Sequence, residues 1–171
     1  KSMIAVFNEQ KAETNNEVLY RHVSDLCRKH MEEELHADVR TVLVNHVRIK
    51  LEGEIKKELS RNSLQFLKTF VNIWLKFEHH VTIIRNIFLV LDRNYILHLN
   101  GPIKSIWDMG LDLFRTNIIQ VYEIRSRLTN ILLDLIQTER NGNVIESFQL
   151  TTCLNMLSHL QVYETFFQAP L

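Results

Sequence analysis

Histidine and acidic side chains are the residues of this sequence whose types could bind a metal or transfer protons. His30 and His36 flank the acidic run Glu32, Glu33 and Glu34, a spacing that could form a loose carboxylate–imidazole site. Acidic residues are also common in the first turn of a helix, where the helix dipole stabilises them. We therefore expect this run to begin a helix, and an enzyme of unknown type that uses this region is the minor alternative.

The other candidates for chemistry favour structural roles. His79 and His80 are adjacent, so they point to different faces of a helix and cannot easily share an ion. The pair Asp92 and Arg93 is typical of structural ion pairs and caps near helix ends. The sequence contains no glycine-rich phosphate loop, no nucleophile elbow and no zinc-type cysteine pairing. We predict no catalytic residue, no metal site and no cofactor.

The overall charge excludes simple electrostatic partners. Twenty basic and 20 acidic residues balance, so no global field steers the chain to nucleic acid or to an anionic membrane. Acidic residues are interleaved with the local basic cluster around Lys56 and Lys57, which is typical of a solvated face. No stretch approaches the 18 or more apolar residues of a membrane span. We expect no direct nucleic-acid partner and no membrane partner.

The two cysteines leave two interpretations open. Cys27 and Cys153 each lie inside a helical pattern, so two buried thiols in a reducing compartment is the first interpretation. A secreted, cytokine-like four-helix bundle with a Cys27–Cys153 disulfide is the alternative. Residues 1–10 lack a basic flank followed by a long apolar run, and they open inside a helical pattern without an initiator Met. We expect the sequence to be an excerpt of a longer protein.

Helices must position all of these residues. Only 4 Gly and 2 Pro occur, which favours long helices with short connections. The segment Asn15-Asn16-Glu17 supplies a capping side chain and an acid for a helix start, Asn62 or Ser63 is the next cap, and no convincing strand alternation is present. The pattern predicts an all-α fold with helices over 15–29, from 33 to about 58, over 64–99 with a break near 78–80, over 103–121 and 124–139, and a last helix carrying residues 148–167.

The segment 81–98 is apolar on two sides of one helix, whereas a surface helix needs only one apolar stripe to join its core. Either this helix lies at the centre of the domain, or its second face docks another chain. The first stripe contains Val81, Ile84, Phe88, Leu91 and Tyr95, and the second contains Ile83, Ile87, Val90 and Leu97.

Three segments carry a resemblance to a known family. IIRNIFLVLDRNYI (83–96), IWDMGLDLFRTNII (106–119) and LLDLIQTERNGNVI (132–145) resemble the amino-terminal repeats of cullins. LYRHVSDLC (19–27) and LNMLSHLQVYETFF (154–167) fall at the right distances before and after them. Within that family, IWDMGLDLFR and MLSHLQVY resemble the fourth cullin class, whose adaptor is a damaged-DNA-binding protein with three β-propellers.

The resemblance implies a fold and a function. Cullins are elongated, non-catalytic scaffolds of RING ubiquitin ligases, found in nucleus and cytoplasm, and their amino-terminal half is a solenoid of five-helix cullin repeats. The RING subunit, and through it the E2 enzyme, binds the carboxy-terminal half, which this sequence does not include. The resemblance places the first repeat, with a truncated first helix, at 1–100 and the beginning of the second at 101–171. The remaining helices of repeat one would be 16–30, 33–59, 63–80 and 81–98.

The resemblance also implies a docking surface for the substrate-receptor adaptor on the second and fifth helices of repeat one. Asn16 and Ser24 are small and polar where other cullins often place aromatic residues, which favours the propeller adaptor over BTB or Skp-type adaptors. The implied adaptor-binding residues are Asn16, Tyr20 and Ser24 on the second helix, and Ile83, Asn86, Ile87, Val90 and Asn94 on the fifth.

Overall fold

A computed structural model describes residues 1–9 and 15–168, and within these residues the chain forms helices and no strand, as the sequence predicted. Two segments, η1 and η3, are π-helical, and η2 is a short 3₁₀ helix. The elements are α1 (Ser2–Phe7), α2 (Asn16–Arg28), α3 (Glu32–Asn45), η1 (His46–Leu51), α4 (Glu52–Glu58), α5 (Ser63–Ile87), α6 (Leu89–Asn94), η2 (Ile96–His98), α7 (Ile106–Phe114), η3 (Arg115–Ile119), α8 (Tyr122–Arg140), α9 (Ser147–His159) and α10 (Tyr163–Phe166).

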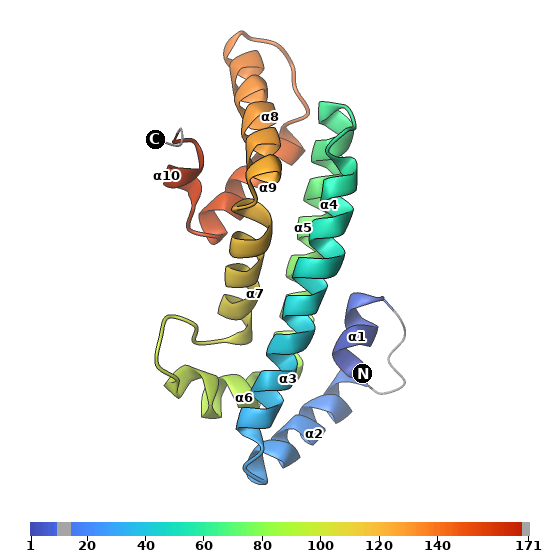
Figure 1. The fold of residues 1–171 in the computed structure, drawn as a ribbon, viewed down its shortest axis with the longest axis vertical. Helices are drawn as coiled ribbons and strands as arrows, with labels where there is room; N and C mark the ends of the chain where they lie inside the picture. Colours follow the sequence, from blue (N-terminus) through green and yellow to red (C-terminus); the bar gives the residue numbers. More distant parts are fainter. Residues whose placement is uncertain (10–14, 169–171) are drawn as a thin grey trace.

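The helices stack into an elongated body (Figure 1). The continuous rod of α3, η1 and α4 runs beside α5 along much of the long axis. The helices α2 and α6 lie at one end, and α8, α9 and α10 lie toward the other (Figure 1). The helix α7 and its extension η3 lie between these ends and pack against α5 and η1.

The predicted helix starts are confirmed where a capping side chain was recognised. The Asn15 side chain accepts a hydrogen bond from the N–H of Glu17 (3.2 Å), and α2 begins at the next residue. The Asn62 side chain accepts one from the N–H of Gln65 (2.9 Å) and starts α5. Each cap satisfies a backbone donor that has no partner inside its own helix.

The predicted break near residues 78–80 is wrong. The helix α5 continues for 25 residues to Ile87, and the chain turns at Phe88 (φ −99°, ψ 20°). No Gly or Pro interrupts this stretch, and the His80 ring is buried against Phe7 with ring centroids 5.9 Å apart. The expected helices 63–80 and 81–98 are therefore replaced by one long helix and the short elements α6 and η2.

The Asn-Gly-Pro segment ends one helix but does not start the next. Gly101 has φ +116°, a left-handed conformation that suits glycine. The helix α7 starts later than predicted, at Ile106, because Ser105 accepts a hydrogen bond from the N–H of Asp108 (3.1 Å). Asp108 Oδ2 in turn accepts one from the N–H of Lys104 (3.0 Å), the residue before the N-cap.

Aromatic rings dominate the centre of the core. The ring of Phe114 on α7 lies 4.9 Å from Trp74, 5.2 Å from Phe77 and 6.3 Å from Phe70, all three on α5 (centroid distances). Edge-to-face and offset arrangements at such distances are favourable beyond simple area burial. This cluster packs α5 against α7 in the middle of the body.

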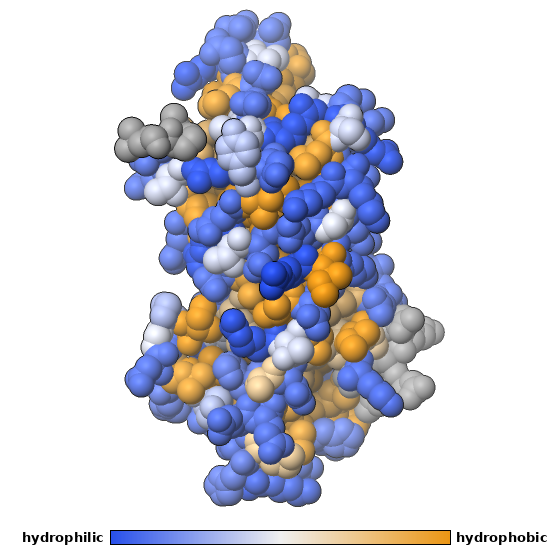
Figure 2. Space-filling view, in the orientation of Figure 1, coloured by the Kyte–Doolittle hydropathy of each residue, from blue (hydrophilic) through white to orange (hydrophobic). Residues whose placement is uncertain are grey.

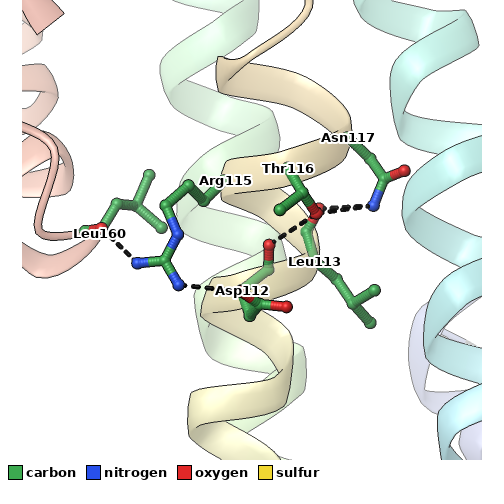
Figure 3. Close-up of polar contacts among 6 residues, drawn as sticks. All are labelled: Asp112, Leu113, Arg115, Thr116, Asn117 and Leu160. Carbon is green, nitrogen blue, oxygen red and sulfur yellow. Dashed lines mark hydrogen bonds and ion pairs between the residues drawn. The ribbon is translucent and has the colours of Figure 1, made fainter. Parts of the chain in front are cut away.

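The π segment η3 anchors α7 to the end of α9 (Figure 3). Arg115 Nη1 donates to the carbonyl of Leu160 (2.7 Å), and Nη2 donates to Asp112 Oδ1 (2.9 Å). Thr116 Oγ1 donates to the carbonyl of Asp112 (2.9 Å), and Asn117 Nδ2 donates to that of Leu113 (3.0 Å). Side chains thus take up carbonyls at the wider π turn and at the C-terminal end of α9.

The cysteine alternative is wrong. Cys27 and Cys153 are both buried and both free, so the predicted Cys27–Cys153 disulfide of a cytokine-like bundle does not form. Burial raises the pKa of the Cys153 thiol to about 12, and burial followed by the charge of Glu32 raises that of Cys27.

Across the ranges 1–9 and 15–168, none of the helices combines the length and the apolar character that crossing a membrane requires.

Candidate protein-docking surface

The acidic run Glu32, Glu33 and Glu34 forms the first turn of α3. Glu33 and Glu34 are exposed, whereas His36 is half-buried with its ring 5.6 Å from the ring of Tyr95. Burial, and then the charge of Arg40, lowers the pKa of His36. Among the described residues, no three His, Cys, Asp or Glu side chains gather closely enough to hold a metal ion. The contact that the structure shows for His36 is its packing against the ring of Tyr95.

A cavity of about 260 Å³ lies between α1, η1 and α5. The ring of Phe7 stacks on that of His46 at 3.7 Å, and burial lowers the pKa of His46 to about 3. At the rim, Glu9 pairs with Lys76 (3.1 Å) and lies 3.8 Å from His80 Nε2. The contacts around the cavity therefore join α1 and the residues that follow it to η1 and α5.

The structure brings the two predicted halves of the docking surface together. The helix α2 packs against α6 and against α5 (Figure 1). On α2, Asn16 is exposed and Tyr20 and Ser24 are half-buried. All three predicted residues of this helix therefore retain some accessible surface, next to the elements that carry the other five.

The five predicted residues of the fifth helix are divided between two elements. Ile83, Asn86 and Ile87 belong to the end of α5, whereas Val90 and Asn94 belong to α6. Asn86 and Asn94 are exposed, and Ile83 and Val90 are half-buried against the core.

Ile87 requires a correction. It was assigned to an apolar stripe that the core leaves unused, but it is only 3% exposed and belongs to the core. The physical reason is that α5 extends to this residue and α2 packs against both α5 and α6, so the junction is enclosed. Ile87 therefore lies beneath the predicted docking surface and has almost no accessible area.

The other stripe of the segment packs inward as predicted. Val81, Ile84, Phe88 and Leu91 are buried, and Tyr95 is half-buried. On the second stripe, Leu97 is 51% exposed. Figure 2 shows apolar side chains among polar ones over the end of the body where α6 lies.

Asp92 is the residue whose contacts the sequence did not reveal. It lies on α6 with 5% exposure, and its Oδ1 accepts a hydrogen bond from the N–H of Ile106 (2.8 Å). Arg85 Nε lies 3.5 Å from Oδ2. Burial raises the pKa of Asp92, while the Ile106 hydrogen bond and the Arg85 charge oppose this shift. The expected role in ion pairing and capping is confirmed, but the ion-pair partner is Arg85 and the capped N–H belongs to another helix.

The fold and this surface define a class of protein. Helices stacked side by side, each covering its neighbour's apolar face, form a helical solenoid, and such proteins bind others through extended surfaces. The chain belongs to the cullin family, since residues 1–171 match the family described as the cullin alpha solenoid domain. The predicted family and fold class are thus confirmed.

The relatives that it matches include members of the fourth class, as the resemblance indicated. The chain is 37% identical to human Cullin-4A over 164 residues, which is 96% of the chain and 21% of that protein. It is 31% identical to Cullin-4 of Dictyostelium discoideum over 167 residues, 96% of the chain and 21% of the relative. Identity to Cullin-3 of the same organism is 27%, over 99% of the chain and 22% of the relative. The chain spans about a fifth of the length of these relatives.

Proposed function

We propose that this chain is the adaptor-binding arm of a non-catalytic cullin scaffold in a RING ubiquitin ligase. The observation that carries the proposal is the packing of α2 beside α6. It places Tyr20 and Val90 on two adjoining elements at one end of the elongated body. The Cullin-4 relatives support the proposal, because they match nearly the whole chain.

The burial of each residue suggests how the surface would work. Half-buried Tyr20, Ile83 and Val90 supply apolar contact at the centre, where binding energy is usually concentrated. Exposed Asn86 and Asn94 supply polar groups around it, as at the rim of ordinary interfaces. Asn16 extends the polar rim along α2, and half-buried Ser24 lies two helical turns beyond it. Ile87 packs in the core beneath the surface.

The mechanism in this proposal is geometric. In this proposal, the elongated body, in which aromatic side chains pack α5 against α7, holds a substrate receptor at a set distance from the E2 enzyme. The RING subunit binds that E2 enzyme and is itself bound elsewhere on the scaffold. Fixing two partners on one rigid frame raises the effective concentration of one near the other. The proposal keeps the two repeats at 1–100 and 101–171 and a location in nucleus and cytoplasm.

The triple β-propeller adaptor is the favoured partner. The chain matches the Cullin-4A proteins of human and mouse and Cullin-4 of Dictyostelium discoideum at 31% identity or better. Small polar side chains at Asn16 and Ser24 leave that part of α2 without the large apolar anchors that interfaces usually bury. A BTB or Skp-type adaptor would have fewer anchors to engage there.

The test is a pull-down of the 171-residue chain with purified propeller, BTB and Skp-type adaptors. We expect the propeller adaptor to bind and the double variant Tyr20→Ala, Val90→Arg to lose at least about tenfold in affinity. Because Val90 is half-buried, a second variant, Asn86→Arg with Asn94→Arg, changes exposed positions alone and should block docking without altering the core. Asn130→Arg, an exposed asparagine on α8, is the matched control and should bind normally.

Normal binding by both surface variants, with folded circular-dichroism spectra, would show that the adaptor docks elsewhere. Binding of the BTB or Skp-type adaptor in preference to the propeller protein would retain the scaffold proposal and reject the partner. Failure of all three adaptors to bind the wild-type chain would reject adaptor docking itself.

A further inference from the structure

The helix α6 is a separate element whose direction α5 does not impose. The backbone leaves helical geometry at Phe88, and α6 then contains only six residues, Leu89–Asn94. A helix this short is not stable by itself in water, so its place depends on tertiary contacts. Two of the proposed docking residues, Val90 and Asn94, lie on this element.

One buried side chain connects α6 to its neighbours. Asp92 Oδ1 accepts the N–H of Ile106, the first residue of α7 (2.8 Å), and its Oδ2 lies 3.5 Å from Nε of Arg85 on α5. Within residues 1–9 and 15–168, no side chain or backbone group makes a hydrogen bond to Oδ2. A single carboxylate therefore contacts elements on both sides of α6 in the chain.

The start of α7 is completed by this contact. Local side chains provide part of its cap, since Ser105 accepts the N–H of Asp108 and Asp108 accepts that of Lys104. The N–H of Ile106 would stay unpaired without Asp92, because the first N–H groups of a helix have no partner inside it. This hydrogen bond thus joins α6 to α7 through Asp92 and Ile106, two residues that are 14 positions apart in the sequence.

A buried carboxylate is an inefficient means of simple stabilisation. Burial disfavours its charged form, and an apolar residue of similar volume at such a position is often neutral or stabilising. A hydrogen bond to a fixed N–H does, however, set direction as well as distance, which apolar packing does not.

We propose that Asp92 is the positioning residue of the docking surface. By holding α6 against the first turn of α7, it sets the orientation of Val90 and Asn94 relative to Tyr20 on α2. The inference rests on the proposed function for its consequence in adaptor binding. The hydrogen bond between α6 and α7 is a property of the chain alone and is tested without any partner.

The first experiment measures amide hydrogen exchange of residues 90–94 by NMR in the 171-residue chain. Asp92→Leu keeps the position apolar and filled but removes the acceptor, and we expect these amides to exchange at least about tenfold faster. Asp92→Asn keeps an acceptor oxygen and should restore protection to within about threefold of wild type. Ile131→Val on α8 is the control for a general loss of stability and should leave these amides unchanged relative to the rest of the chain.

The second experiment measures affinity for the propeller adaptor at a temperature where all variants are folded. We expect Asp92→Leu to weaken binding about tenfold, with Asp92→Asn and Ile131→Val close to wild type. Unchanged protection and unchanged affinity in Asp92→Leu would overturn the inference. If the wild-type chain binds no adaptor, the proposed function fails, while faster exchange in Asp92→Leu would still establish that Asp92 joins α6 to α7.

Discussion

Gly110 on α7 lies so close to Val81 on α5 that a Cβ atom at position 110 would be 2.9 Å from Val81 Cγ1 and 3.2 Å from Cγ2. Real Cβ atoms almost never approach another heavy atom this closely. The missing side chain is therefore what allows α7 to pack its aromatic residue Phe114 against α5. The contact joins α5, which ends beneath the proposed docking surface, to α7 in the middle of the body.

Gly110→Ala should destabilise the chain. Overpacking in a core costs about 1–3 kcal/mol, and the better helix propensity of alanine offsets about 1 kcal/mol of that. We expect a net loss of about 1 kcal/mol in the free energy of unfolding, measured by urea denaturation. Gly53→Ala on α4 is the matched control, because a Cβ there meets nothing within 4 Å, and it should gain about 0.5–1 kcal/mol. Equal stabilisation by both changes would show that α5 and α7 are less tightly packed.

Arg115→Met should loosen the end of α9. The arginine donates to the carbonyl of Leu160 and to Asp112, both partly buried contacts, and methionine retains only the apolar stem. We expect a loss of about 1–3 kcal/mol in thermal or urea unfolding, because the carbonyl loses a charged donor. Arg140→Met, at the exposed last residue of α8, should change stability by no more than about 0.5 kcal/mol. A similar effect for both variants would contradict the role of Arg115.

Acidification should destabilise the contact of α1 with η1 and α5. The folded chain lowers the pKa of His46 to about 3 and also lowers that of His80, in both cases chiefly by burial, with Glu9 opposing the shift at His80. The unfolded chain binds more protons below pH 6.5, so the stability is complete above that value and is lost as the pH falls toward 3. Each histidine contributes at most about 1.4 kcal/mol per pH unit.

The measurement for this prediction is urea unfolding at pH 7.5 and 5.5. His46→Phe keeps a ring for stacking on Phe7 but cannot take up a proton, so its stability should fall less between the two pH values than that of wild type. His22→Phe, at an exposed position on α2, is the control and should keep the wild-type difference. A His46→Phe variant with an unchanged pH difference would place the sensitivity elsewhere.

Both cysteines should be free but unreactive in the native chain. With a pKa of about 12, the thiolate fraction of Cys153 at pH 8 is about a thousandfold smaller than for a thiol at 9, and burial of Cys27 acts in the same direction. Titration with a coloured disulfide reagent should find two thiols in denaturant and essentially none in minutes under native conditions. Finding no thiol in unreduced, denatured protein would restore the disulfide that the structure contradicts.

Local sequence signals predicted much of this fold. Capping by Asn15 and Asn62 acts over two or three residues, so the pattern of residue types is sufficient to recognise it. The inward stripe through Ile84 and Leu91 also follows from helical spacing alone. The cullin resemblance rested on motifs spread along the chain, and the family match confirmed it.

The errors occurred where packing outweighed local preference. The length of the helical pattern over 64–99 suggested a break near residues 78–80, but His80 is buried against Phe7 and α5 continues to Ile87. Because α5 extends this far and α2 packs against it, Ile87 is buried, although helical spacing had placed it in the second, non-core stripe with Ile83 and Val90.

The sequence by itself thus determined the all-α class, the helix caps, the inward stripe and the family. Only the tertiary structure decided where α5 ends, that Ile87 is buried and that Asp92 joins α6 to Ile106 at the start of α7. The physical reason is range: caps and stripes depend on neighbours within a few residues, whereas burial and tertiary hydrogen bonds depend on helices that meet only after the chain has folded.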